Sequence, residues 1–214
     1  MAGITIAGFP QRAQVFENHW RETNAARNGS PVVLSGGYGV ERLQGDRESY
    51  LRLSEAIIAL ENSEREQQNQ VNTLREPARE RISQLRAMVD AFLAGTLYIK
   101  QLPQCPNKLS GQSVYRSACN DAAEVWGRID SDKRLGIAIP FLLPGNIGRA
   151  QLVTDAAALM AAWDRLVQIR QQLQKARTER DAILKATPTR FTQYRKAVRA
   201  VLPTGHALLV TLPK

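Results

Sequence analysis

The chain has 214 residues and a net charge of +9, with 43% hydrophobic and 23% charged residues. This length and composition are typical of a folded chain with one large domain or two small ones. No stretch approaches the ~20 uncharged apolar residues that a membrane-spanning helix needs. The N-terminus also lacks the basic start and long apolar run of a secretory signal. We therefore expect a cytoplasmic protein without a membrane partner.

Two short amphipathic helices are predicted, at residues 9–27 and 113–133, because apolar residues recur on one helical face. These residues are Phe9, Ala13, Phe16 and Trp20 in the first helix and Tyr115, Ala118, Ala122 and Trp126 in the second. Asn28-Gly29 is a suitable end for the first helix. Trp20 and Trp126 correspond at a shift of 106 residues. We expect both rings to anchor a core, in preference to forming a binding platform.

Apolar runs that contain several glycines follow both short helices, at residues 31–39 and 137–148. A glycine-rich loop before a helix can bind phosphate, because its free N–H groups and the helix dipole face the anion. Neither run matches a nucleotide-binding motif, and no Lys-Ser or Lys-Thr pair follows. We therefore predict tight, buried connections and no cofactor.

A long amphipathic helix is predicted after each glycine-rich run. One begins near Asp46 and the other near Asp155, where an acidic side chain can cap the first turn. The apolar seam of the second helix recurs every seven residues, at Leu152, Leu159, Leu166 and Leu173. This spacing is typical of coiled coils and keeps one apolar line against a partner helix.

Each long helix meets a proline near its last third. Thr187 can cap a new helix at Pro188, so we predict a true break there, and a kink or break at Pro77. A further helix and a glycine follow in both halves. A short apolar segment then closes each half, at residues 96–103 and 206–213, and is predicted to be a strand or an extended tail.

The two halves of the sequence repeat the same order of elements. A shift of 109 residues aligns residues 34–93 with 143–202 without a gap and gives eleven identities. We predict a mainly all-α protein formed by tandem duplication of a helical module. The repeats at 1–104 and 105–214 are expected to pack as a bundle with long antiparallel helices, in two cores or in one joint core.

The positive charge belongs to the second half of the chain. Residues 1–104 have a net charge of zero, and residues 105–214 carry the whole +9. Acids of the first repeat align with bases of the second at Glu61 and Arg170, Glu66 and Lys175, Glu76 and Lys185, and Asp90 and Arg199. Such inversion is expected where the copies pack against each other, within one molecule or between two.

A basic helical face in the second half is the candidate binding surface. Its residues are Arg165, Arg170, Lys175, Arg177, Lys185, Arg195, Lys196 and Arg199. Such a face can follow a phosphate backbone with salt-dependent affinity. Only Phe191 and Tyr194 lie nearby for base stacking, so sequence-specific recognition is not indicated.

Residues suited to catalysis or metal binding are sparse. Cys105, Cys119, His19 and His206 lack the spacing of a zinc site. We expect two free thiols, or a local disulfide if the protein is exported. The acids between residues 55 and 66 are interleaved with polar residues and indicate a solvated helix face. We therefore predict no catalytic residue, metal or cofactor.

Three functions follow from these features. The first is a non-enzymatic helical scaffold or protein-interaction module, part of a larger protein or assembly, with a protein partner or self-association. The second is binding of nucleic acid or another polyanion through the basic face. The third, an enzyme, requires a pocket that gathers His206 or a pair of carboxylates.

Overall fold

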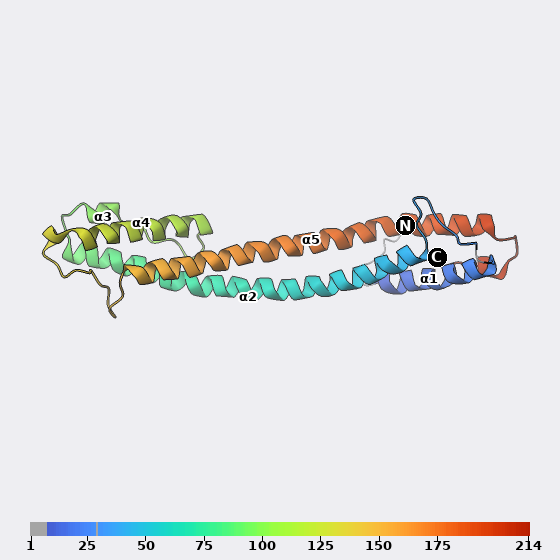
Figure 1. The fold of residues 1–214 in the computed structure, drawn as a ribbon, viewed down its shortest axis with the longest axis horizontal. Helices are drawn as coiled ribbons and strands as arrows, with labels where there is room; N and C mark the ends of the chain where they lie inside the picture. The colour runs from blue at the N-terminus through green and yellow to red at the C-terminus, as the bar shows by residue number, and fades with distance from the viewer. Residues whose placement is uncertain (1–7, 29) are drawn as a thin grey trace. The chain divides into compact units, whose positions relative to one another are not determined.

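The computed structural model describes residues 8–28 and 30–214, and these are mostly helical (Figure 1). The elements are α1 (Phe9–Ala26), α2 (Val40–Phe92), α3 (Tyr98–Gln101), α4 (Gln112–Ser131), the 3-10 helix η1 (Lys133–Leu135), α5 (Arg149–Val201) and α6 (Ala207–Val210). Within the described residues no strand forms. The prediction of a mainly helical protein with long packed helices is therefore confirmed. None of the described helices is long and apolar enough to cross a bilayer.

The chain folds into two compact units. Unit 1 contains the described residues of Met1–Glu61 together with Gln171–Lys214, and unit 2 contains Asn62–Arg170. Unit 1 therefore holds α1, the first part of α2, the last part of α5, and α6. Unit 2 holds the rest of α2, α3, α4, η1 and the first part of α5. Each unit combines segments from both of the ranges 1–104 and 105–214.

The core of unit 1 is rich in aromatic rings from α1 and α5. Phe16 stacks on Phe191 with ring centroids 3.7 Å apart, and Trp20 stacks on Tyr194 at 4.2 Å. All four side chains are buried. Tyr50 brings α2 into the same core. Stacked aromatic pairs contribute about 0.5–1.5 kcal/mol beyond their buried area, so these contacts hold segments that lie far apart in the sequence.

The core of unit 2 contains more aliphatic side chains, from α2, α4 and α5. Ile82 and Leu85 of α2, Trp126 of α4, and Leu152 and Leu159 of α5 are all fully buried. Burying each such side chain contributes about 1.5–3 kcal/mol. As in unit 1, α2 and α5 both contribute buried residues to one core, so neither half of the chain contains a whole core.

Trp20 and Trp126 each anchor a loop to a core, which confirms the sequence prediction. The indole N–H of Trp20 donates to the carbonyl of Val32 at 2.9 Å. The indole N–H of Trp126 donates to the carbonyl of Phe141 at 2.8 Å. Both rings are fully buried. A buried indole needs such a partner, because an unpaired N–H would lose its bond to water.

The connections before both long helices are tight, as predicted, but they are only partly buried, because Gly36, Gly37 and Gly145 at the turns are exposed. Leu34 pairs with Tyr38, and Leu143 pairs with Ile147, in two isolated bridges. The chain reverses between the paired residues through left-handed backbone conformations. These conformations are Gly36 with φ 73°, Gly37 with φ 71°, Gly145 with φ 82° and Asn146 with φ 59°. Glycine and asparagine are the residues that tolerate them best.

The predicted starts of the long helices were wrong. α2 and α5 each begin six residues before the expected caps, Asp46 and Asp155. Leu43 and Leu152 lie in the additional turns and are buried, so core packing extends both helices toward their N-termini. The two carboxylates are therefore inside helices, where Asp46 accepts a 2.7 Å hydrogen bond from Tyr38.

The predicted break at Pro188 was also wrong, because Pro77 and Pro188 both lie inside continuous helices. Thr187 caps no new helix. Its buried hydroxyl donates to the carbonyl of Ile183, one turn earlier, at 2.7 Å. An interior proline costs about 3 kcal/mol. Buried residues before and after each proline offset this cost, because a break would remove one side of their packing.

The closing segments are helical turns and not strands or fully extended tails. α3 and α6 lie within the segments 96–103 and 206–213. Gly95 with φ 83° and Gly205 with φ 87° reverse the chain just after the long helices, as glycine commonly does at a helix end. This reversal directs Leu102 back into the core of unit 2.

Candidate interaction surfaces

Ion pairs set the register between α2 and α5 within unit 1. Arg177 of α5 donates to Glu61 of α2 at 2.7 Å. Further along, Arg190 of α5 pairs with Asp46 of α2. Asp46 precedes Glu61, whereas its partner Arg190 follows Arg177, so the two helices run antiparallel in this unit.

Unit 2 has the same kind of contact between the other parts of α2 and α5. Arg170 donates to Glu64 at 2.7 Å and to Gln68 at 3.1 Å. Arg81 and Asp155 lie 3.6 Å apart. The order of these contacts is again antiparallel. The partly buried charges of Arg81 and Asp155 favour one register, because a shifted register would leave them without partners.

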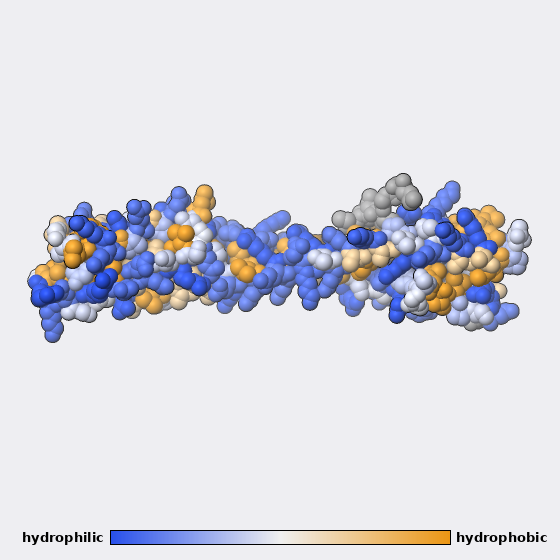
Figure 2. Space-filling model, turned by 90° about the horizontal axis from the view of Figure 1, so that it is seen from above, coloured by the Kyte–Doolittle hydropathy of each residue, from blue (hydrophilic) through white to orange (hydrophobic). Residues whose placement is uncertain are grey.

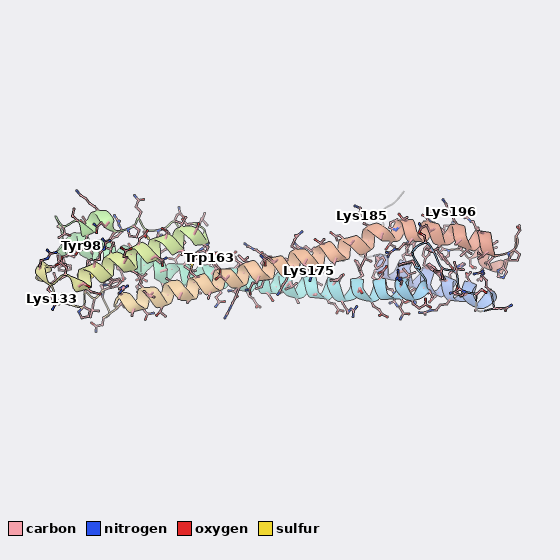
Figure 3. The ribbon with its side chains drawn as sticks, turned by 45° about the horizontal axis from the view of Figure 1, so that its top comes forward. Tyr98, Lys133, Trp163, Lys175, Lys185 and Lys196 are labelled. Carbon is pink, nitrogen blue, oxygen red and sulfur yellow. The ribbon has the colours of Figure 1, made fainter. Side chains whose placement is uncertain are left out.

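The eight residues of the predicted basic face divide between the units. Arg165 and Arg170 belong to unit 2, and Lys175, Arg177, Lys185, Arg195, Lys196 and Arg199 belong to unit 1. Arg170 and Arg177 are engaged with acids of α2. Within the described residues, Lys185, Lys196 and Arg199 are exposed and form no ion pair. Figure 3 labels Lys175, Lys185 and Lys196 along α5.

The aligned acids and bases of the two halves do not pair with one another. Glu61 contacts Arg177 and not Arg170, and Glu76 contacts Arg79 and Lys108. Because each unit contains segments from both halves of the chain, the positive charge is nevertheless distributed over both units. Unit 1 has 15 basic and 9 acidic residues, a net +6, and unit 2 has 14 and 11, a net +3.

A buried ion pair in unit 1 was missed by the sequence reasoning. Glu17 of α1 has no exposed side-chain surface and accepts hydrogen bonds from Arg47 of α2, at 2.7 and 3.2 Å. The hydrogen bond to Glu17 raises the pKa of Arg47. The available signal was the position of Glu17, next to Phe16 and three residues before Trp20 on the apolar face of α1.

A buried polar network also lies in unit 1. The Nδ1 atom of His19 is 2.7 Å from the hydroxyl of Tyr194, and its Nε2 atom is 2.8 Å from the carbonyl of Leu208. Thr23 lies 3.1 Å from the same tyrosine hydroxyl. Burial raises the pKa of Tyr194, so the phenol keeps its proton. The network ties α6 to α1 and α5.

A basic pocket of 530 Å³ lies at one end of unit 2. Its lining includes Tyr98, Arg128, Asp132, Lys133 and Arg134. Asp132 accepts hydrogen bonds from Arg134 at 2.9 Å and from Tyr98 at 3.0 Å. The bonds from Arg134 lower the pKa of Asp132 to about 2. The carboxylate of Asp132 is therefore already paired within the pocket. The remaining cations of the lining, Arg128 and Lys133, give the pocket an excess of positive charge.

An apolar pocket of 310 Å³ lies in unit 2 between the end of α2 and the loop that connects η1 to α5. It is lined by Met88, Phe92, Ile137, Ala138, Pro140, Phe141 and Leu142. No charged residue contributes to this lining. Phe92 is 64% exposed, which is unusual for a large ring in water. On the face seen in Figure 2, apolar residues form orange patches within a mostly polar surface.

Both cysteines are free thiols in unit 2. Cys105 is half-buried and lies 3.5 Å from the carbonyl of Arg79. Cys119 is buried, and its burial raises the thiol pKa to about 11. Among the described residues, no three or more His, Cys, Asp or Glu side chains are grouped to hold a metal ion.

Comparison of the chain with protein-family models, curated proteins and solved structures gave no match. The surfaces themselves therefore carry the functional argument. They comprise exposed cations on α5 in unit 1 and the basic and apolar pockets of unit 2.

Proposed function

We propose that the protein is a non-enzymatic helical module that binds other proteins or itself. The observation that carries this proposal is the exposure of large apolar side chains on an otherwise polar surface. Phe92 is 64% exposed, Leu97 70% and Val210 87%. Exposed apolar surface of this kind marks contact sites in soluble proteins when it is clustered, and the pocket beside Phe92 provides such a cluster.

We also infer that the module arose by tandem duplication and pairs its own two copies. The bounds of α2 correspond to those of α5 at a shift of 109 residues, as do those of α3 and α6 and both isolated bridges. The seven buried residues of α1 all correspond to buried residues of α4 at a shift of 106. Chance similarity of amphipathic helices predicts neither correspondence.

The contacts between α2 and α5 support the duplication independently. Asp46 with Arg190 corresponds to Asp155 with Arg81 when the two copies exchange roles. The contact of Glu61 with Arg177 corresponds in the same way to that of Gln68 with Arg170. Reciprocal contacts of this kind are expected when two copies of one segment pack against each other.

Photo-crosslinking in the source cells tests the interaction function. A photoreactive amino acid replaces Phe92 in one variant, Val210 in a second and the exposed polar residue Gln172 in a control. We expect distinct cross-linked species at one or both apolar positions and none at Gln172. A monomer at all concentrations in sedimentation, together with no specific cross-link at either apolar position, would refute the proposal.

Binding of a polyanion is the second candidate, and one feature of unit 1 favours it. No Asp or Glu follows Asp181 in the sequence, and Lys185, Lys196 and Arg199 are exposed without an ion pair. The test is a salt series of binding to double-stranded DNA and to heparin. Lys196→Glu/Arg199→Glu is expected to weaken binding and to reduce the log–log salt slope by about 2.

The double variant Arg52→Glu/Arg42→Glu is the control, because it makes the same charge change on α2 of unit 1. An equal loss of binding affinity in both double variants would indicate that net charge alone attracts the polyanion. Absence of binding at low salt would exclude this second candidate.

A further inference from the structure

We propose that the basic and apolar pockets of unit 2 form one docking site for a segment of a partner protein. The segment carries a bulky apolar side chain next to carboxylates. This inference rests on the proposed interaction function and specifies the chemistry of the partner. The apolar side chain occupies the pocket beside Phe92, and the carboxylates face Arg128 and Lys133.

The apolar pocket requires an apolar occupant. All seven lining side chains are apolar, so none of them offers a hydrogen bond to a polar ligand. Phe141 is buried and forms the floor, whereas Phe92 and Leu142 are exposed at the rim. A volume of 310 Å³ lies at the low end of the range for ligand sites. It suits one or two large side chains, as at the anchor of a protein interface.

A hydrogen bond and a short stretch of chain connect the lining of the basic pocket to that of the apolar pocket. The backbone N–H of Phe141 donates to Asp130 at 2.7 Å, and Asp130 precedes Ser131 in the lining of the basic pocket. Arg134 and Ile137, one from each lining, are only three residues apart, which is at most about 11 Å along the chain. One short peptide segment can therefore reach both pockets.

The free charge at this site is positive. Asp132 is satisfied by Arg134 and Tyr98. Arg128 has only a 3.9 Å contact with Glu124, and Lys133 forms no ion pair within the described residues. Figure 3 shows Tyr98 and Lys133 at the same end of unit 2. Carboxylates of a partner would complement this charge and fix the direction of binding.

The corresponding place in unit 1 lacks the same chemistry. At a shift of 109 residues, Val201 stands for Phe92 and Asn28 for Ile137. The smaller valine is only 37% exposed. A concave pocket with a buried floor is also better suited to an inserted side chain than to a lipid surface. Proteins that bind a lipid surface do so with apolar residues that protrude. These differences favour a peptide segment bound to unit 2.

Selection from a displayed library of random twelve-residue peptides tests the docking site. The full-length chain is the bait, and Phe92→Asp is screened in parallel. We expect wild type to enrich peptides with a large apolar residue flanked by Asp or Glu. The enriched peptide is then synthesised, and its affinity is measured by fluorescence anisotropy. Phe92→Asp should weaken binding at least about tenfold, and Arg128→Glu/Lys133→Glu about two- to fivefold at low salt.

Two exposed apolar residues provide matched controls. Val201→Asp changes the corresponding position of unit 1, and Leu109→Asp adds the same charge elsewhere in unit 2. Both should bind the peptide as wild type does. Because Phe92 ends α2 and is largely exposed, its substitution leaves the core in place, which circular dichroism will verify. Should Phe92→Asp nevertheless unfold, Leu142→Asp makes the same test at the opposite rim.

Several results would overturn the docking site. These are no enriched class of peptide, equal binding by Phe92→Asp, or enrichment of basic peptides. Binding to phosphatidylserine vesicles that Phe92→Asp abolishes, without peptide enrichment, would replace the protein segment by a lipid surface. Cross-links at Val210 would survive any of these outcomes, so failure of the docking site is distinguishable from failure of the interaction function.

Discussion

Arg190 of α5 pairs with Asp46 of α2, and its guanidinium carbon also lies 4.0 Å above the ring of Tyr38. The corresponding pair in unit 2 is Arg81 with Asp155, at 3.6 Å. One aspartate near the start of each long helix thus binds one arginine near the end of the other. Each of these two ion pairs therefore takes one residue from the range 1–104 and the other from the range 105–214.

Reversal of this ion pair should show that the two charges act together. Asp46→Arg places two cations against each other and is expected to lower the free energy of unfolding by about 2 kcal/mol. The double variant Asp46→Arg/Arg190→Asp should recover more than half of that loss. Urea unfolding of the four proteins in the cycle measures the coupling. Additive losses in the double variant would contradict the pairing.

Separation of the chain into residues 1–104 and 105–214 should abolish both cores. Residues 1–104 supply only one side of each unit, and residues 105–214 supply the other. We expect neither fragment to unfold cooperatively alone at low micromolar concentration. An equimolar mixture should recover the helical signal and the melting transition of the intact chain. Cooperative unfolding of either fragment as a monomer would contradict this prediction.

The buried ion pair of unit 1 should be more sensitive to losing one partner than to losing both. Arg47→Ala leaves the Glu17 carboxylate buried without a cation, at a cost of about 3–5 kcal/mol. At the corresponding positions unit 2 has Ala123 and Ala156. Glu17→Ala/Arg47→Ala therefore reproduces a packing that the fold already tolerates. The double variant should be more stable than Arg47→Ala alone, as measured by thermal unfolding.

The regular features of the sequence predicted the fold well. Apolar periodicity located α1, α4 and both long helices, and glycines marked the turns beside Gly36 and Gly145. Local rules failed where tertiary packing opposed them. Thr187-Pro188 has the pattern of a helix start, but side chains on both sides of it pack in the core of unit 1 and keep α5 continuous. A cap residue contributes only about 1 kcal/mol, which is less than burial of the adjoining side chains.

The candidate sites were harder to predict, because they depend on contacts between distant segments. The basic stripe on α5 was visible in the sequence, but its division into paired and free cations depends on acids of α2. The apolar pocket joins Phe92 to Pro140, which lie in different halves of the chain. The sequence around each of these residues contains no motif that marks a binding site. The two residues line the same pocket only because the fold brings them together.

Protonation of Asp132 provides a pH test of the basic pocket. Its folded-state pKa of about 2 lies below the value of about 3.9 in an unfolded chain. Its interaction with Arg134 therefore stabilises the fold fully above about pH 5. That contribution is lost as the pH falls toward 2. Carbon NMR of the carboxyl group should give a midpoint near 2 in wild type and a higher midpoint in Arg134→Ala.

Arg116→Ala is the control for this titration, because Arg116 is an exposed arginine of unit 2 that does not contact Asp132. Its midpoint should equal that of wild type. A midpoint near 3.9 in wild type would show that the hydrogen bonds from Arg134 to the carboxylate do not persist in solution.

The polar network of unit 1 should behave as one unit. His19→Val removes one partner from the Leu208 carbonyl and one from the Tyr194 hydroxyl, which keeps Thr23 at 3.1 Å. Loss of a buried hydrogen-bond partner costs about 1–3 kcal/mol. At the corresponding positions unit 2 has Val125, Ile129 and Leu85, all buried. The triple variant His19→Val/Thr23→Ile/Tyr194→Leu copies that apolar set.

The triple variant should therefore be more stable than His19→Val alone, and denaturant unfolding compares the two. Amide hydrogen exchange adds a local measurement. Because the Leu208 carbonyl loses its bond to His19 in both variants, residues 207–210 should exchange faster in both than in wild type. The network has no cooperative role if the losses in unfolding free energy of the three single variants add up to the loss of the triple variant, since independent groups give additive losses.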